Sequence, residues 1–206
     1  MERIDAVFFD IGGVCLTNGW GADARAAAAR HFGLEADRGE VEARHAEVVE
    51  AFERGEVSLD EYLDRVVFYR SRPFERDAFV RFMYAQSRPD ESVLGLVRTL
   101  ASTQTYRLAA INNESRELNR YRIDTFGLAA IFRAFFSSCY VGVSKPDARI
   151  YAIALDVMQA DPAASLFVDD RDENVAAARA VGMRTIHMTD AGRLPHELRE
   201  AGIDLR

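Results

Sequence analysis

The sequence predicts an α/β protein with a doubly wound parallel sheet and a small, inserted helical-bundle cap. Three observations predict this fold. Residues 6–9 are a continuous apolar run, which is typical of a central strand buried on both faces. Residues 17–88 show helical patterns and no strand pattern. From residue 89 onward, helical segments alternate with short apolar runs, which indicates right-handed crossovers between parallel strands.

Two domains follow from this order of elements. We expect residues 1–16 and 89–206 to form the α/β core domain, because the strand patterns lie only there. We expect residues 17–88 to form a helical cap domain, inserted after the first strand. A chain of 206 residues is long enough for one substantial core and a small second domain.

Four helices are expected in the insertion. The first is rich in alanine and ends at Gly33, and the second ends before Gly55. Ser58 and Glu61 form a capping box at the start of the third helix, and Pro73 precedes the fourth. The predicted helices cover residues 22–31, 39–52, 59–67 and about 74–85.

The core continues with a helix that begins at Pro89 and Asp90 and leads into a strand at residues 106–111. Each later apolar run is separated from the next by one helical segment, as a parallel sheet requires. Further strands are expected at about 133–137, 165–168 and 184–188, and further helices at 114–125, 147–159, 173–181 and about 195–201.

The composition excludes several classes of partner. The net charge is −7 and no basic run occurs, which argues against nucleic acid or an anionic membrane. No apolar stretch approaches membrane-crossing length, and the N-terminus lacks a signal-peptide pattern. Cys15 and Cys139 are too few for a disulfide framework. We therefore expect a cytoplasmic protein, and the sequence does not indicate its oligomeric state.

Polar side chains follow four of the predicted strands, close to the point where each strand ends. Because the carboxyl ends of parallel strands meet at one edge of a sheet, we expect these side chains to share a crevice. A single acid or an Asn pair in such a place is often only a turn former, so the whole set carries the prediction. The set is Asp10, Asn112, Asn113, Lys145, Asp169 and Asp170.

Lys145 is the only lysine among the 26 Lys and Arg residues of the chain. The ammonium of lysine is a compact point charge on a flexible stem, whereas the guanidinium of arginine is a wide planar fork. A site that places a cation between two anions needs the compact group. The position of this lysine beside the other polar residues therefore indicates a functional role.

These motifs, in this order, resemble those of the haloacid dehalogenase-like (HAD) hydrolase superfamily over the whole chain. FFDIGGV resembles its first motif, INN its second, the lysine of SKPDARIY its third and FVDDRDENVAAARAVGM its fourth. Asp169 and Asp170 followed by Asn174 are most similar to sugar-phosphate phosphatases and to the phosphatase domain of soluble epoxide hydrolases. The resemblance implies a HAD-like Rossmannoid core with a helical cap after the first motif.

The resemblance also implies a nucleophile and a metal site. Asp10 would attack phosphorus and form an aspartyl-phosphate. A Mg²⁺ cofactor would be held by the Asp10 carboxylate, the Gly12 carbonyl and Asp170, since this ion prefers oxygen ligands. Asp169 or Asn174 would support these ligands from a second layer.

The same resemblance assigns the groups that bind substrate. Lys145 would bridge the nucleophile and the phosphoryl oxygens. Asn112, Asn113 and the turn amides of the first motif, including that of Gly13, would donate hydrogen bonds to the phosphate. Trp20, just past the first motif, is expected either to face the substrate or to pack the cap against the core.

Two positions depart from the pattern of the superfamily. Gly12 stands where most of its phosphatases carry a second Asp as general acid and base, and Asn112 stands where Ser or Thr is usual. A positioned proton donor contributes about 10²- to 10⁴-fold to a rate, so its loss slows poor leaving groups most. A neighbouring acid, Glu114 or Asp172, is a candidate replacement.

The favoured function is a Mg²⁺-dependent phosphatase that acts on a small phosphorylated metabolite, such as a sugar phosphate. One alternative is a dehalogenase-like hydrolase that attacks carbon, since such relatives also lack the second Asp. They need no metal, however, and leave the pair Asp169 and Asp170 unexplained. Another alternative is a protein that binds phosphate esters with little or no turnover because of Gly12.

Overall fold

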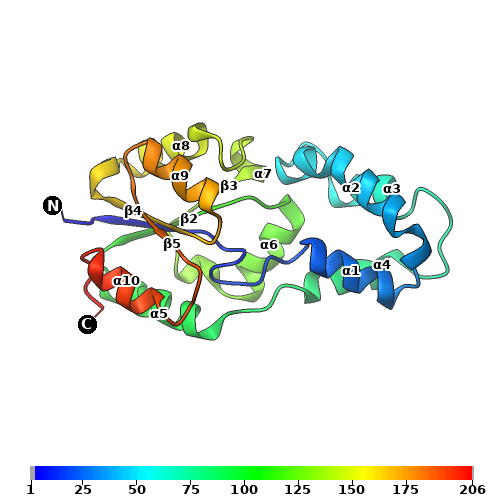
Figure 1. Cartoon of the computed structure of the whole chain (residues 1–206), viewed down its shortest axis with the longest axis horizontal. Helices are drawn as coiled ribbons and strands as arrows, with labels where there is room; N and C mark the ends of the chain where they lie inside the picture. Colours follow the sequence, from blue (N-terminus) through cyan, green and yellow to red (C-terminus); the bar gives the residue numbers. More distant parts are fainter. Residues whose placement is uncertain (1–2, 206) are drawn as a thin grey trace.

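The computed structural model describes residues 3–205 and contains a five-stranded, wholly parallel sheet (Figure 1). The strands lie in the order β3-β2-β1-β4-β5, so β1 is central and the chain winds outward from it on both sides. This arrangement confirms the predicted doubly wound α/β fold. The strands are β1 Ala6–Phe9, β2 Arg107–Asn112, β3 Ala134–Ser137, β4 Ser165–Asp169 and β5 Arg184–His187.

Helices cover both faces of this sheet. In Figure 1, α5 (Glu91–Thr103) and α10 (Leu194–Glu200) lie on one side, and α8 (Ala148–Met158) and α9 (Asp172–Ala180) lie on the other. Buried residues of α5 and α10 share one hydrophobic cluster with the sheet, and those of α8 and α9 share a second. Within residues 3–205, no helix has both the length and the apolar character that crossing a membrane requires.

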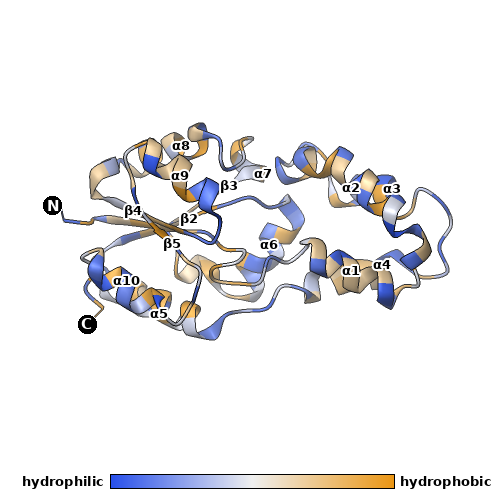
Figure 2. Ribbon diagram, viewed as in Figure 1, coloured by the Kyte–Doolittle hydropathy of each residue, from blue (hydrophilic) through white to orange (hydrophobic). Residues whose placement is uncertain are grey.

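The central strand β1 is buried on both faces, which accounts for its continuous run of apolar residues. Val7 and Phe9 pack in the cluster under α5 and α10, whereas Ala6 and Phe8 pack in the cluster under α8 and α9. All four side chains are fully buried, so neither face tolerates the polar alternation of a half-exposed strand. In Figure 2, the middle of the sheet carries hydrophobic colouring, and the hydrophilic segments lie mainly on the outer helices and loops.

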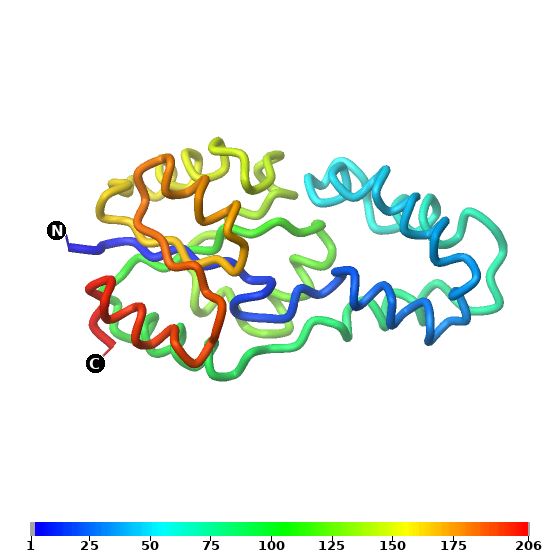
Figure 3. Tube along the Cα trace, viewed as in Figure 1, coloured from blue at the N-terminus to red at the C-terminus, as the bar shows by residue number. Residues whose placement is uncertain are grey.

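The segment between β1 and α5 forms a separate group of helices at one end of the molecule (Figures 1 and 3). These helices share a hydrophobic cluster of their own, in which the rings of Phe52 and Tyr62 stack with centroids 4.2 Å apart. This separate cluster supports the proposed division into a core and a cap of residues 17–88. The helices are α1 Ala22–His31, α2 Arg38–Glu53, α3 Leu59–Val66 and α4 Arg76–Ala85.

The predicted bounds differ from the observed ones by at most two residues. The capping box is confirmed, because the Ser58 N–H donates to Glu61 Oε2 at 3.0 Å and the Glu61 N–H donates to Ser58 Oγ at 3.3 Å. The helix α7 (Ser138–Val141) was not predicted, because four residues are too few to show a helical period. The remaining elements are α6 Arg116–Thr125 and the 3₁₀ helices Glu35–Asp37, Leu128–Ala130 and Pro162–Ala164.

Two linkers join the core to the inserted helices, and they run side by side. The Thr17 N–H donates to the Arg88 carbonyl at 2.9 Å, and the Thr17 hydroxyl donates to the Gln86 carbonyl at 2.6 Å. Next to them, Leu16 and Pro89 form an antiparallel bridge. The insertion therefore leaves and re-enters the core at one place, beside the carboxyl end of β1.

Candidate active site

Side chains from the ends of β1 and β4 meet around one ammonium group. Lys145 Nζ lies 2.9 Å from Asp10 Oδ1 and 2.6 Å from Asp169 Oδ2. All three residues are buried, with exposed fractions of 5% for Lys145, 7% for Asp10 and 0% for Asp169. The structure therefore brings these three predicted residues together, with the compact cation between two carboxylates.

Asp10 directly follows β1, and one of its carboxylate oxygens is already occupied. Its Oδ1 accepts the Ile11 N–H at 2.7 Å as well as the Lys145 ammonium. Its Oδ2 accepts no hydrogen bond from any of the described residues. Burial raises the pKa of Asp10, and Lys145 opposes this effect. A second cation beside Asp10 would favour its ionised, nucleophilic form.

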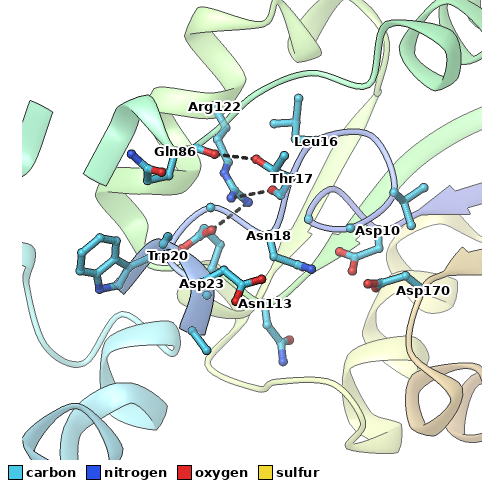
Figure 4. A pocket seen from close by; sticks show the side chains of 18 of the residues that line it. Asp10, Leu16, Thr17, Asn18, Trp20, Asp23, Gln86, Asn113, Arg122 and Asp170 are labelled. Atoms are coloured by element: carbon cyan, nitrogen blue, oxygen red, sulfur yellow. Dashed lines mark hydrogen bonds and ion pairs between the residues drawn. The ribbon is translucent and has the colours of Figure 1, made fainter. Parts of the chain in front are cut away.

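Three carboxylates lie close enough to share a cation. Asp10, Asp169 and Asp170 offer oxygen atoms that lie within 4.8 Å of one another. Figure 4 shows the carboxylates of Asp10 and Asp170 side by side. Among the described residues, Asp170 Oδ1 is buried without a hydrogen-bond partner, and burial raises the pKa of this carboxyl. An unpartnered oxygen among acids fits a divalent cation with a preference for carboxylates, such as Mg²⁺.

Asp169 differs from Asp170 because both of its oxygens have partners. Oδ2 accepts from Lys145, and Oδ1 accepts the Arg171 N–H at 2.8 Å and the Asn174 Nδ2–H at 3.0 Å. Asn174 is itself only 3% exposed. The geometry therefore suits Asp169 and Asn174 to holding Lys145 in place, and leaves Asp170 as the better direct metal ligand.

The glycines after Asp10 shape the floor of the site. Gly13 has a φ of +81°, and a Cβ atom at this position would lie 2.2 Å from Asp170 Oδ2. The Gly13 N–H already donates to the Leu16 carbonyl at 2.7 Å, which argues against the expected role of this amide in phosphate binding. Gly13 instead makes room for Asp170, and the neighbouring Gly12 lines the cavity described next.

A cavity of about 1020 Å³ opens between these residues and the inserted helices. Core residues close one end of it, and α1, α2 and the linker before α1 form the other walls. A substrate in this cavity would touch both parts of the molecule. The lining includes Asp10, Asn113, Lys145 and Asp170 from the core, and Trp20, Arg25, His45, Phe52 and Glu53 from the insertion.

The ring of Trp20 packs on the hydrophobic cluster of the inserted helices. It lines the cavity, although Figure 4 shows it well away from Asp10. Its ring packs edge-on against Phe79 with centroids 5.6 Å apart, and its Nε1–H donates to the Tyr62 hydroxyl at 2.9 Å. Trp20 thus packs within the inserted helices and forms a distal wall of the cavity.

The family profile of haloacid dehalogenase-like hydrolases matches residues 4–182. The chain belongs to this family. The match confirms the resemblance that the four motifs indicated, and it makes the protein a hydrolase.

Relatives of this HAD hydrolase include phosphatases. A sesquiterpene phosphatase from Aspergillus oryzae is 31% identical over 157 residues, which cover 76% of this chain and 80% of that protein. A flavin mononucleotide hydrolase from Arabidopsis thaliana is 28% identical over 165 residues, or 80% of this chain and 66% of that protein. A bifunctional epoxide hydrolase from Sus scrofa is 36% identical over 75 residues, or 36% of this chain and 14% of that protein.

Solved structures show that the HAD fold is shared. A HAD family enzyme from Bacteroides thetaiotaomicron, in complex with magnesium and inorganic phosphate, superposes with a TM-score of 0.74 and 16% identity over 92% of this chain and 96% of that one. An L-2-haloacid dehalogenase superposes with a TM-score of 0.62 and 20% identity over 88% of this chain and 83% of that one. At these low identities, the two superpositions show that this chain has the same fold.

In this HAD chain, the surroundings of Asn112 argue against its expected role as a phosphate ligand. Its Nδ2–H donates to Asn119 Oδ1 at 3.0 Å, and its Oδ1 accepts from Ser137 Oγ at 2.7 Å. The residue is 1% exposed and does not line the cavity. The reason is that β2 runs one residue further than predicted, so Asn112 still pairs with Ser137 of β3.

Asn113 lines the cavity and also holds the lysine. Its Nδ2–H donates to the Lys145 carbonyl at 2.9 Å, and its Oδ1 accepts the Lys145 N–H at 2.8 Å. This pair of hydrogen bonds fixes the backbone from which the ammonium extends. The geometry therefore supports a positioning role for Asn113 more strongly than a direct contact with phosphate.

The structure argues against Glu114 and Asp172, the two candidates to replace the general acid that is absent at Gly12. Glu114 is buried and pairs with Arg122 Nη1 at 2.9 Å, and its other oxygen accepts the Ser115 N–H at 2.9 Å. Burial raises the pKa of Glu114, and Arg122 opposes this effect. Asp172 has an exposed side chain and does not line the cavity.

Two residues of the site were not predicted from the sequence. Glu53, the last residue of α2, lines the cavity, and burial raises its pKa to about 7. Arg122 of α6 is 1% exposed and binds Glu114 and both linkers. The only signal for Glu53 is its place just before Gly55, where the insertion turns back, and such glutamates are common at helix ends.

Proposed function

We propose that this chain is a Mg²⁺-dependent phosphatase that hydrolyses a monophosphate ester of a small metabolite. The observation that carries the proposal is that Asp10 contacts the Lys145 ammonium and shares a cluster of carboxylates with Asp170, which has an unpartnered buried oxygen. A carboxylate reaches an anionic phosphate only where cations neutralise the charge of both groups.

The relatives support phosphate-ester chemistry more than any one substrate. Their names describe a sesquiterpene phosphatase, a flavin mononucleotide hydrolase and a phosphoserine phosphatase from Thermus thermophilus, the last 34% identical over 100 residues. The three names share a phosphorylated substrate, and the organic part of that substrate differs in each. We therefore keep the substrate class at small phosphorylated metabolites, sugar phosphates included.

The carboxylates of Asp10 and Asp170, with the Gly12 carbonyl, would hold the Mg²⁺ ion. When bound, it would supply positive charge that neutralises the phosphoryl oxygens. Asp169 and Asn174 would keep Lys145 beside the nucleophile, through the contacts that Asp169 makes to both residues.

The reaction would proceed in two displacements at phosphorus. Asp10 Oδ2 would attack first, because Oδ1 is occupied by the Ile11 N–H and by Lys145. The bond between phosphorus and the leaving oxygen would break, which leaves an aspartyl-phosphate. Water would then attack phosphorus and release phosphate and free Asp10.

The inserted helices would act as the cap that sets specificity. The cavity supports this, because residues 17–88 provide its walls opposite the acids. A cap that closes over the cavity would exclude bulk water from the reacting groups.

Two treatments test the proposal. Asp10→Asn and chelation with EDTA should each abolish turnover of p-nitrophenyl phosphate, and added Mg²⁺ should restore the chelated enzyme. Asp172→Asn is the matched control, since Asp172 is an exposed acid outside the cavity. Undiminished turnover by Asp10→Asn would exclude the proposed nucleophile.

Gly12 favours one alternative, a protein that binds phosphate esters with little turnover, since the side chain of a second acid is absent there. Tight binding without turnover across a panel of phosphorylated sugars and nucleotides would support it. The dehalogenase alternative predicts chloride release from 2-chloropropionate in EDTA. The unpartnered oxygen of Asp170 argues against that alternative, because attack on carbon needs no cation there.

A further inference from the structure

This inference rests on the proposed phosphatase function and concerns the proton that the departing oxygen needs. Gly12 carries no side chain to supply it. We propose that Glu53 of α2 is the general acid and base of this site, reaching the reacting groups from the insertion. The carboxyl groups that line the cavity are Asp10, Asp23, Glu53, Asp90, Glu114 and Asp170.

Four of the other five carboxyl groups either have a proposed role or are bound by neighbouring groups. Asp10 and Asp170 are the proposed nucleophile and metal ligand. Glu114 is bound on both oxygens, by Arg122 and by a backbone N–H. Asp90 caps α5, where its Oδ1 accepts two backbone N–H groups at 3.0 and 3.1 Å. Only Asp23 and Glu53 remain.

Asp23 reaches the cavity (Figure 4), but its side chain is open to solvent. It is exposed and lies in the first turn of α1, where the helix dipole stabilises a negative charge. Glu53 lies at the opposite, C-terminal end of its helix, where the dipole disfavours a negative charge. Of the two, Glu53 is therefore the better proton donor.

The end of α2 is fixed against the core, so Glu53 is held at the site. Ser138 Oγ donates to the Glu53 carbonyl at 2.6 Å and accepts the Glu114 N–H at 3.0 Å. Two residues further on, a Cβ atom at Gly55 would lie 2.6 Å from the Cys139 carbonyl, so the turn after α2 lies directly on α7. One hydroxyl thus joins the insertion to the loop that follows β2.

Charged groups from several elements face the Glu53 carboxyl. Glu114 and Asp10 favour its protonated form, and Arg171 and Lys145 favour its ionised form. Among residues 3–205, its carboxylate makes no hydrogen bond or ion pair, and burial raises its pKa to about 7. A carboxyl group that exchanges its proton near neutral pH suits both halves of acid–base catalysis.

In the proposed reaction, Glu53 gives up one proton in the first displacement and regains one in the second. Asp10 attacks phosphorus, the electron pair of the breaking bond goes to the leaving oxygen, and the Glu53 proton joins that oxygen to give an alcohol. Water then attacks phosphorus and gives one proton to the Glu53 carboxylate. The bond between phosphorus and Asp10 breaks, its electrons return to Asp10, and phosphate leaves. Glu53 ends protonated, as it began.

The test compares Glu53→Gln with wild type on p-nitrophenyl phosphate, which has a good leaving group, and on an alkyl phosphate, which has a poor one. The ratio kcat/KM reports the first displacement. We expect kcat/KM to fall about 10²-fold or more for the alkyl phosphate and much less for p-nitrophenyl phosphate. With p-nitrophenyl phosphate, we also expect a burst of one equivalent of p-nitrophenol, because the second displacement lacks its base.

Further variants keep the test decisive. Glu50→Gln, an exposed position one turn earlier on α2, should behave as wild type, and Glu53→Asp should recover part of the lost alkyl phosphate activity. Equal losses on both substrates, or a leaving-group effect in Asp23→Asn in place of Glu53→Gln, would overturn the proposal. An inactive wild type would instead refute the phosphatase function, so the two failures are distinguishable.

Discussion

The Lys145 ammonium lies 2.9 Å from Asp10 Oδ1, with the side chain of the lysine only 2% exposed. On its other side, Asp169 Oδ2 lies 2.6 Å away. The space between the two carboxylates admits a point-like cation on a thin stem, whereas a planar guanidinium needs more width. This contact gives a physical reason for a lysine here in a chain whose other basic residues are arginines.

Lys145→Met and Lys145→Arg separate charge from shape. The methionine variant leaves two buried carboxylates facing each other, so we expect a loss of about 3–5 kcal/mol in the free energy of unfolding. We expect both variants to lose turnover of p-nitrophenyl phosphate, by about 10²-fold or more. Urea denaturation and steady-state kinetics measure the two effects. Wild-type turnover by Lys145→Arg would show that the width of the cation does not matter.

Arg122 connects the candidate site to both linkers, so its removal should destabilise the contacts at the site and at the linkers. Its Nη1 lies 2.9 Å from Glu114, its Nε donates to Ser87 Oγ at 3.0 Å, and its Nη2 donates to the Thr17 carbonyl at 3.2 Å. Arg122→Met leaves a buried carboxylate unpaired, so we expect a loss of about 3–5 kcal/mol in unfolding free energy.

A double variant checks this interpretation of Arg122. Arg122→Met with Glu114→Gln removes the unpaired charge, so it should lose less stability than the sum of the two single variants. Urea denaturation of all four proteins gives the coupling energy. Additive losses would mean that the ion pair of Arg122 and Glu114 contributes nothing of its own.

The residues at the strand ends could be predicted because parallel topology alone brings them together. Predicting that Asp10, Lys145 and Asp169 lie together required only the order of strands and loops. It did not require knowledge of side-chain packing. Asn112 shows where this reasoning stops. A shift of one residue in the end of β2 decides whether its side chain points to the substrate or pairs with Ser137.

Glu53 and Arg122 could not be predicted, because their roles depend on how the insertion sits on the core. The hydrogen bond from Ser138 to the Glu53 carbonyl joins residues 85 positions apart. The contact of Arg122 with Thr17 joins residues 105 positions apart. No local pattern in the chain reports contacts of this kind, and buried arginines are uncommon enough that a surface position is the usual expectation.

The proposed metal site should be detectable without turnover. Mg²⁺ bound at this site should raise the thermal midpoint of the protein, since a ligand that binds only the native state stabilises it. Asp170→Asn removes the carboxylate with the unpartnered oxygen, so we expect a much smaller Mg²⁺-induced shift and at least a tenfold loss of turnover, about 1.4 kcal/mol. Differential scanning fluorimetry with and without Mg²⁺ measures the shift. An undiminished shift in Asp170→Asn would remove this residue from the metal ligands.

Gly13→Ala should damage the site through sterics alone. The new Cβ would lie 2.2 Å from Asp170 Oδ2, and the φ of +81° is strained for alanine. We expect a loss of about 1–3 kcal/mol in unfolding free energy and a large loss of turnover. Gly95→Ala is the matched control, since Gly95 lies inside α5 with nothing within 4 Å, and it should gain about 0.5–1 kcal/mol. Equal effects of the two substitutions would contradict the proposed crowding at Asp170.

His45 should make the stability of the inserted helices depend on pH. The Tyr62 hydroxyl accepts from Trp20 Nε1 and lies 2.8 Å from His45 Nδ1. Its own hydrogen therefore remains available for donation to the ring nitrogen of a neutral His45. Burial, together with Arg25, lowers the pKa of His45 from 6.5 to about 4. Between these values the unfolded chain binds a proton that the folded chain does not, so stability is complete above pH 6.5 and is lost as the pH falls toward 4.

His45→Gln keeps an acceptor for Tyr62 but cannot titrate, so it isolates this effect. Between pH 7 and pH 5, we expect wild type to lose about 1 kcal/mol more unfolding free energy than His45→Gln, a figure reduced because the ring is only partly buried. Trp20 is the only tryptophan of the chain and bonds to Tyr62, so its fluorescence during urea denaturation reports on these helices directly. Parallel loss of stability in both proteins would mean that His45 is already protonated, or freely hydrated, in the folded state.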